Sequence, residues 1–151
     1  MRLNFISSAE KKKIIEQLNE QFGIEKLPYL LFHVGKQRVR AFSGNLSREE
    51  LKIIEQTLRI DNIGIYLLTQ EQEIRLSFDV VSLLKNQIKK NLIELSDSET
   101  QDWFKGHDIE LNHEIKPGPV ILKNKECLIG AGKSNGKTIF NFVPRERRIK
   151  N

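Results

Sequence analysis

The segment from Gly130 to Thr138 carries the residues most suggestive of nucleotide chemistry, because it contains both a Gly-Lys-Ser and a Gly-Lys-Thr tripeptide. A phosphate-binding loop needs a glycine, four further residues and then Gly-Lys-Ser/Thr, so that backbone amides surround the phosphates where a helix begins. In the two possible registers Cys127 or Ala131 stands where the first glycine is required. Residues 139–144 are strand-like, so we expect a glycine-rich hairpin and no NTPase site.

Two histidines and three acidic residues between positions 107 and 114 form the densest set of potential metal ligands. Their spacing matches no standard zinc pattern, and Cys127, the only cysteine, has no second cysteine to complete a site. We therefore expect this segment to be a polar, exposed loop. The sequence also offers no nucleophile with an obvious base and orienting group, so we expect no catalytic residues, no metal site and no cofactor.

The positive charge of the chain is concentrated near its C-terminus. Residues 116–151 hold 9 of the 25 lysines and arginines but only 2 of the 20 acidic residues, whereas the remainder is slightly acidic. This asymmetry indicates a polyanionic partner, because basic side chains that neutralise phosphates release counterions from nucleic acid. Arg145, Arg147 and Arg148 can each donate two hydrogen bonds to a phosphate. The glycines of residues 130–136 would let an RNA backbone approach closely.

The elements that must position these residues fall into two halves. In the N-terminal half, capping boxes at Ser7–Glu10 and Ser47–Glu50 predict two helices, each with one buried face. Apolar and alternating runs predict strands at residues 28–34, 37–42, 60–69 and 73–76. A short apolar helix is expected at residues 78–84. The pattern is typical of helices packed on a mostly antiparallel sheet.

The C-terminal half is predicted to be mainly β. A polar linker is expected at residues 86–91, and a third capping box at Ser96–Glu99 begins a short helix that carries Trp103 and Phe104. Strands separated by tight turns are expected at residues 120–122, 127–131 and 138–143. We therefore predict an α+β fold, with an α/β domain at residues 1–90 followed by a small β-barrel at residues 91–151.

The segment from Leu95 to Arg148 resembles PUA and PUA-like RNA-binding domains. The matching stretches are Trp103–Ile109, Gly118–Leu122, Ile129–Lys133 and Asn141–Arg148. A helix that ends in Lys-Gly, a Leu-Ile-Gly-x-Gly strand and a final Asn-x-x-Pro-Arg run resemble the C-terminal domain of the Sun/Fmu family of RNA cytosine-5 methyltransferases. The whole chain, including Arg75–Leu84, also resembles ribosome-biogenesis factors that join an α/β pre-PUA domain to a PUA domain.

This resemblance implies a non-catalytic RNA-binding protein that acts in rRNA or tRNA maturation, in ribosome biogenesis, or as an accessory to an RNA-modifying enzyme. It implies that structured RNA lies against the end of the predicted helix, the glycine-containing strand and the basic tail. The residues expected to bind RNA are Lys105, Gly106, Gly130, Gly132, Lys133, Lys137, Arg145, Arg147 and Arg148. The methyltransferase portion of the Sun/Fmu family has no counterpart in this sequence, so the resemblance does not imply methylation by this chain.

Two alternatives remain open at the level of sequence. The basic surface could meet an acidic protein, which would make the chain an adaptor or a subunit of an RNA-modifying enzyme. Alternatively, Lys133 and Lys137 could hold the phosphates of a nucleotide. The N-terminal half is expected to dock a protein partner. We expect no membrane association, because no apolar run approaches the roughly 20 residues that span a bilayer, and we expect a cytoplasmic location from the single cysteine.

Overall fold

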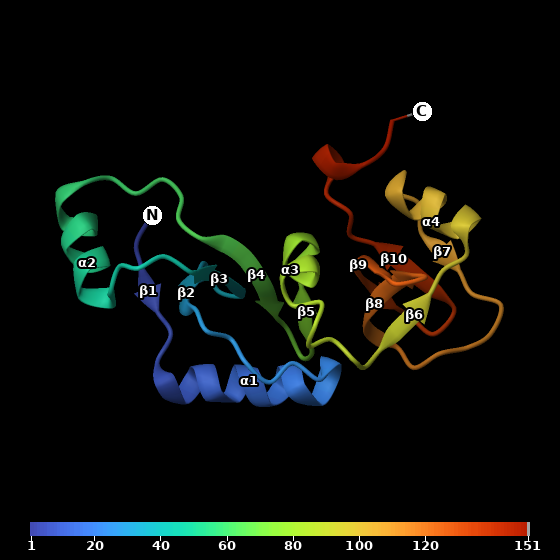
Figure 1. The fold of residues 1–151 in the computed structure, drawn as a ribbon, viewed down its shortest axis with the longest axis horizontal. Helices are drawn as coiled ribbons and strands as arrows, with labels where there is room; N and C mark the ends of the chain where they lie inside the picture. Colours follow the sequence, from blue (N-terminus) through green and yellow to red (C-terminus); the bar gives the residue numbers. More distant parts are fainter. Residues whose placement is uncertain (151) are drawn as a thin grey trace.

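Two five-stranded sheets, each accompanied by helices, make up the fold (Figure 1). The computed structural model describes residues 1–150. The N-terminal half forms the first sheet and the C-terminal half forms the second, so the predicted α+β class is confirmed. No helix among the described residues is long and apolar enough to span a bilayer.

The first sheet has the strand order β1-β2-β3-β4-β5 and is antiparallel throughout. Its strands are β1 (Asn4–Phe5), β2 (Leu30–Val34), β3 (Arg38–Phe42), β4 (Ile65–Gln70) and β5 (Ile74–Leu76). The helices of this half are α1 (Ser8–Phe22), α2 (Arg48–Thr57) and α3 (Phe78–Leu83). Tight hairpins join β2 to β3 and β4 to β5, as the turn residues between the apolar runs predict.

Helix α1 begins at a serine cap as predicted, but its capping box is incomplete. The Ser7 hydroxyl accepts a hydrogen bond from the backbone N–H of Glu10 at 3.2 Å. The Glu10 carboxylate, which the box would direct back to the cap, lies instead 2.7 Å from Nε2 of His33 on β2. In α2, by contrast, Glu50 completes the box with Ser47. The Glu10 carboxylate therefore links α1 to strand β2 and does not cap the N-terminus of its own helix.

The second sheet has the order β6-β8-β9-β10-β7, with β6 parallel to β8 and the other pairs antiparallel. Its strands are β6 (Leu92–Glu94), β7 (Ile109–Glu110), β8 (Gly118–Asn124), β9 (Cys127–Ser134) and β10 (Thr138–Asn141). Helix α4 (Asp97–Phe104) follows β6, and a short 3-10 helix, η1 (Arg145–Arg147), follows β10. Because β6 and β7 are both edges, the small barrel predicted from sequence is a partial barrel that stays open between them.

The segment predicted as a polar linker is packed against the end of α1. The backbone N–H of Lys89 donates to the carbonyl of Phe22 at 2.8 Å, and the Asn91 side chain donates to the carbonyl of Gln21 at 2.6 Å. Ile88 is buried. The polarity of residues 86–91 therefore reflects hydrogen bonds to a helix C-terminus, whose carbonyls lack partners within the helix, rather than a free connection.

The largest hydrophobic core contains residues of both sheets. Ile121 of β8 and Ala131 of β9 belong to the same buried cluster as Val80 of α3 and Leu84, the residue that follows this helix. A second cluster lies within the C-terminal half, around the fully buried Trp103 of α4. Helix α3 thus packs on the second sheet as well as on the first, and the two halves share buried apolar surface.

Candidate functional site

The basic tail of the chain is held between the two halves, above α3 and beside α4 (Figure 1). The guanidinium of Arg147 lies 3.1 Å from the carboxylate of Asp79 on α3. The ring of Phe142 lies under the guanidinium of Arg75 of β5, 4.2 Å from Cζ to the ring centroid. The backbone N–H of Ile149 donates to the carbonyl of Phe104 at 2.8 Å. The tail is therefore a fixed part of the surface and not a free basic strand.

Asn141 anchors the start of this tail. Its side-chain amide donates to the carbonyls of Trp103 at 2.7 Å and His107 at 2.9 Å, and its carbonyl oxygen accepts from the N–H of Val143 at 2.8 Å. Its backbone N–H donates to Asp108 at 2.8 Å. One side chain thus fixes the end of α4 and the turn into η1 at once. The sequence motif that begins at Asn141 contained this residue, but nothing in the sequence alone showed these partners.

Lys105, Gly106 and Arg148 are brought together at the C-terminal end of α4. Gly106 has a φ of +92°, and a Cβ at this position would lie 2.6 Å from Nε of Arg148. That Nε donates to the carbonyl of Val143 at 3.0 Å. Glycine is needed here both for its left-handed backbone and for the space that the arginine occupies. Lys105 is the C-cap residue of α4, so its charge lies where the helix dipole favours a cation.

The three arginines of the tail have different surroundings. Arg145 is exposed at the start of η1, and no ion pair to it is found within residues 1–150. Arg147 is paired with Asp79, and Arg148 is half-buried against Gly106. Lys105 and Arg145 therefore offer phosphate-binding groups that are free of acidic partners in the described part of the chain.

Gly130 and Gly132 of β9 are buried. A Cβ on Gly130 would lie 3.2 Å from Nε1 of Trp103, whose indole N–H donates to the carbonyl of Ile129 at 3.3 Å. A Cβ on Gly132 would lie 2.8 Å from the side chain of Ile139. The glycines predicted to admit an RNA backbone thus have a packing reason for their small size, which is the seating of Trp103 on the sheet.

Lys133 and Lys137 lie in the hairpin formed by β9 and β10. The antiparallel pairing of these strands confirms the predicted hairpin and places a strand where a phosphate-binding loop would begin a helix. Nζ of Lys133 lies 3.5 Å from Glu71, and Nζ of Lys137 lies 3.7 Å from Glu114. The two lysines thus have acidic neighbours of their own, apart from the Lys105 and Arg148 contact.

The polar segment before β8 uses its acidic side chains within the fold. Asp108 accepts from Asn141, and Glu110 accepts from the Thr138 hydroxyl at 3.0 Å. Nδ1 of His107 lies 3.9 Å from Asp102. Within residues 1–150 no group of three or more histidine, cysteine or acidic side chains is arranged to hold a metal ion.

A cleft of about 540 Å³ opens between α3 and α4 and was not foreseen from the sequence. Its walls include Phe78 and Asp79 of α3, Phe104 of α4, Asn124 at the end of β8, and Arg147 of η1. These residues are separated by up to 69 positions in the chain, so no local motif could have announced the cleft. Phe104 was noted in the sequence only as part of a short helix and of the PUA-like stretch Trp103–Ile109, and Phe78 only as part of a short apolar helix.

Comparisons with known proteins place this geometry in context. Residues 90–149 match the family model of the methyltransferase RsmF PUA domain. Ribosomal RNA small subunit methyltransferase F from Vibrio cholerae is 26% identical over 144 residues, which are 95% of this chain and 29% of the relative. The protein of the same name from Shewanella woodyi is 42% identical over 59 residues, 38% of this chain and 12% of the relative. The chain thus spans less than a third of the length of these relatives.

The fold has a counterpart among solved structures. A conserved PUA domain protein from Thermoplasma acidophilum aligns over 96% of both chains with a TM-score of 0.61 and 17% identity. This likeness concerns the fold, and it includes the N-terminal half as well as the second sheet. Together with the family match, it confirms the predicted resemblance to a PUA domain of an RNA methyltransferase.

Proposed function

We propose that this chain, whose residues 90–149 match the RsmF PUA domain, is a non-catalytic protein that binds structured ribosomal RNA through those residues. The observation that carries the proposal is this match, which falls on the part of the chain that holds the basic tail. The relatives are named as methyltransferases of small-subunit ribosomal RNA, so that RNA is the first candidate ligand. A tRNA is the second, because both are structured RNAs rich in unpaired regions.

The binding surface that we propose is centred on the C-terminal end of α4 and on η1. Lys105 and Arg145 would contact phosphates directly, since neither has an acidic partner within the described residues. Arg148 would present its terminal guanidinium nitrogens, because its Nε is already bonded to Val143. Arg147 would contribute after exchanging Asp79 for a phosphate. Lys133 and Lys137 lie on the hairpin beside Glu71 and Glu114, and each would contribute after exchanging that partner for a phosphate.

We also propose that residues 1–90 form a pre-PUA-like domain that orients the PUA domain, and that methylation is catalysed outside these 151 residues. The basis for this division of labour is that the matched region is less than a third of each methyltransferase relative. A cytoplasmic location follows from the proposed ribosomal RNA ligand.

The test is equilibrium binding of the full chain to fluorescent fragments of small-subunit ribosomal RNA, to tRNA and to double-stranded DNA between 50 and 200 mM salt (about the range in which phosphate contacts are resolved). We expect the ribosomal fragments to bind tightest, with a logarithmic salt slope that falls by about 0.7–0.9 for each phosphate contact removed. Lys105→Ala and Arg145→Ala should each lower this slope. The matched control is Lys12→Ala, an exposed position of α1. That helix runs along the edge of the molecule opposite to η1 (Figure 1).

Two results would contradict the proposal. Equal affinity for all three nucleic acids would contradict the preference for ribosomal RNA. Unchanged affinity of the Lys105 and Arg145 variants would contradict the assigned binding surface. Transfer of a methyl group to RNA by the purified chain alone would remove the non-catalytic assignment.

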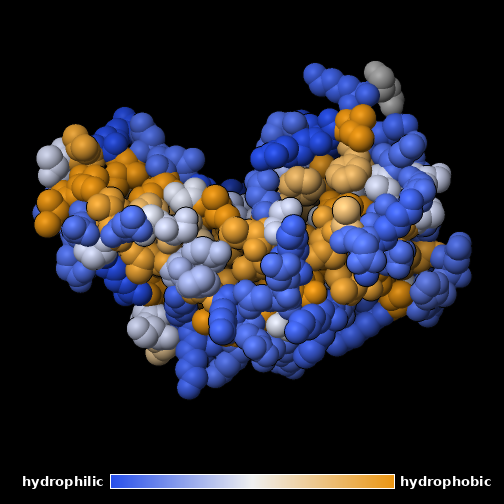
Figure 2. Space-filling view, viewed as in Figure 1, coloured by the Kyte–Doolittle hydropathy of each residue, from blue (hydrophilic) through white to orange (hydrophobic). Residues whose placement is uncertain are grey.

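A second function, accessory subunit of an RNA-modifying enzyme, is favoured by one observation. Ile53 and Leu58, at the end of the molecule formed by α2, are 62% and 63% exposed, and Figure 2 shows apolar surface gathered there. Exposed apolar patches mark sites of protein contact. Co-purification with an RNA methyltransferase domain would test this role. Loss of the complex in Ile53→Asp, but not in Arg145→Ala, would support it over RNA binding alone.

A further inference from the structure

The cleft between α3 and α4 has the size of a ligand site and lies where three elements meet. Its volume of about 540 Å³ falls within the range of small-molecule pockets. One wall comes from α3 of the N-terminal half and another from α4, and Arg147 of η1 also lines the cleft. The cleft therefore borders the surface proposed above for phosphate contacts.

The two walls each carry a phenylalanine. Phe78 and Phe104 both pack against the core around Trp103 and are both only partly buried, so part of each ring remains available to the cleft that it lines. Gly130 also lines the cleft and is buried against Phe78, since a Cβ there would lie 3.4 Å from the ring. Partly exposed aromatic rings are the feature on which unpaired bases stack.

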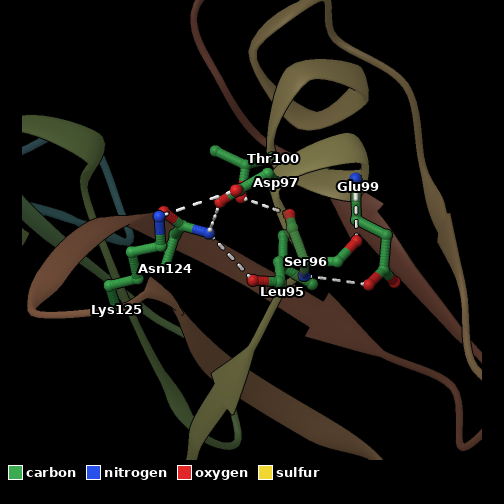
Figure 3. Close-up of polar contacts among 7 residues, drawn as sticks. All are labelled: Leu95, Ser96, Asp97, Glu99, Thr100, Asn124 and Lys125. Carbon is green, nitrogen blue, oxygen red and sulfur yellow. Dashed lines mark hydrogen bonds and ion pairs between the residues drawn. The ribbon is translucent and has the colours of Figure 1, made fainter.

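Asn124, whose side-chain orientation is fixed by two hydrogen bonds, also lines the cleft. The amide nitrogen of Asn124 donates to the carbonyl of Leu95 at 3.0 Å and to the Asp97 carboxylate at 3.1 Å (Figure 3). Both hydrogens of the Asn124 amide group are therefore used. Because both partners are oxygen acceptors, the group facing them must be the NH₂ and not the carbonyl oxygen. The Asn124 carbonyl oxygen is left to accept a hydrogen bond from a group bound in the cleft, such as an amino or imino N–H of a base.

A positive charge at the rim can exchange its partner. Arg147 is paired with Asp79, and the two side chains are 54% and 55% exposed. Exposed ion pairs contribute little net stability, so a phosphate can replace the carboxylate at small cost. The guanidinium would then bind the phosphate bidentately while the attached base enters the cleft.

We propose that this cleft takes one unpaired nucleotide of a bound RNA, with the base between Phe78 and Phe104 and its phosphate on Arg147. The inference rests on the proposed RNA-binding function and adds a ligand class to it, because a paired helix cannot insert a base into a cleft. Recognition of a bulged or looped nucleotide would distinguish this surface from one that binds any RNA by charge.

The test compares two RNAs that differ by one residue. The full chain is titrated with a fluorescent hairpin that carries a single bulged 2-aminopurine and with the same hairpin fully paired. We expect the bulged RNA to bind at least tenfold tighter and its 2-aminopurine fluorescence to change on binding, since loss of a base–aromatic stack costs roughly tenfold or more. Phe104→Leu, which keeps apolar volume but removes the aromatic face, should reduce this preference.

A second variant protects the result against misfolding. Ser82→Trp fills the cleft from an exposed position on α3 and should abolish the preference for the bulged RNA. Ser98→Trp, at an exposed position of α4 outside the cleft, is the matched control and should retain it. Equal binding of both RNAs by the wild-type chain would overturn the nucleotide site and leave RNA binding intact. Absence of salt-dependent binding to either RNA would overturn the proposed function, and this inference with it.

Discussion

The carboxylate of Asp79 on α3 lies 3.1 Å from the guanidinium of Arg147 on η1. An acidic residue of the N-terminal half thus forms an ion pair with an arginine of the basic C-terminal segment. In the proposed RNA complex, a phosphate would replace Asp79 beside Arg147. The fold therefore places an internal competitor beside the surface proposed to bind RNA, and the strength of that competition can be measured.

Replacement of Asp79 by asparagine should raise RNA affinity. Removing the negative charge leaves Arg147 free for a phosphate, and we expect a gain of about two- to fivefold at low salt, the scale of an exposed ion pair. The free energy of unfolding should change by less than about 1 kcal/mol for the same reason. Fluorescence anisotropy and urea unfolding check the two expectations. The double variant Asp79→Asn with Arg147→Ala should lose the gain, and its persistence there would assign the effect to another residue.

Gly106→Ala should destabilise the chain and displace Arg148. The φ of +92° alone makes a side chain costly by about 1–3 kcal/mol, and the new Cβ would also meet the arginine side chain. Gly35→Ala is a matched control, because Gly35 has a φ of +68° but nothing within 4 Å of its Cβ position. Thermal unfolding should show a loss in both variants, whereas only Gly106→Ala should weaken RNA binding. If Gly106→Ala and Gly35→Ala had equal effects on RNA binding, Arg148 would not belong to the RNA-binding surface.

Asn141→Ala should lower stability by about 1–3 kcal/mol, because it leaves partly buried backbone groups near Trp103 and Val143 without their partner. The turn that holds η1 should loosen, so amide hydrogen exchange should accelerate at residues 143–148 more than in the first sheet. Asn112→Ala, in the exposed loop before β8, should change neither quantity. Uniform acceleration throughout the chain would show that Asn141 supports global stability only.

The pKa of Asp97 lies below its ordinary value of 3.8, chiefly because Asn124 donates a hydrogen bond to the carboxylate and secondly because Lys125 is nearby. A carboxyl group whose pKa is lowered by folding contributes stability above its unfolded pKa, and that contribution is lost as the pH falls through the folded value. We expect Asn124→Ala to raise the titration midpoint of Asp97, followed by carbon-13 NMR, by more than Lys125→Met does. The reverse order would make charge the main cause.

The regular elements of the fold were predictable because their signals are local. Ser47 and Ser96 begin helices with complete capping boxes, in which the partner stands three positions ahead in the sequence. The strands that form hairpins were likewise announced by the turns between them. Strands β1 and β7 were missed, because two-residue strands carry no periodicity and depend on a partner far along the chain.

The candidate site was predictable in part. Lys105, Gly106 and Arg148 were expected on one surface from the resemblance to PUA domains, and the contact between Gly106 and Arg148 brings them together. The partners of Arg147 and Lys133 are acidic residues of the first half, at distances along the chain that no motif spans. Composition indicates how many charges a segment carries, but pairing between segments depends on the packed structure.

The core shared by the two sheets has a consequence for how the chain could be divided. Ile121 and Ala131 complete a cluster that includes Val80 and Leu84, so a cut near residue 90 would expose apolar surface on both fragments. Neither fragment would then be expected to keep the cooperative unfolding of a small domain. A protease acting on residues 86–91 would meet hydrogen-bonded backbone instead of a loose hinge. The basic half is therefore expected to keep its fold only when it is joined to the first sheet, so that the two sheets form one structural unit.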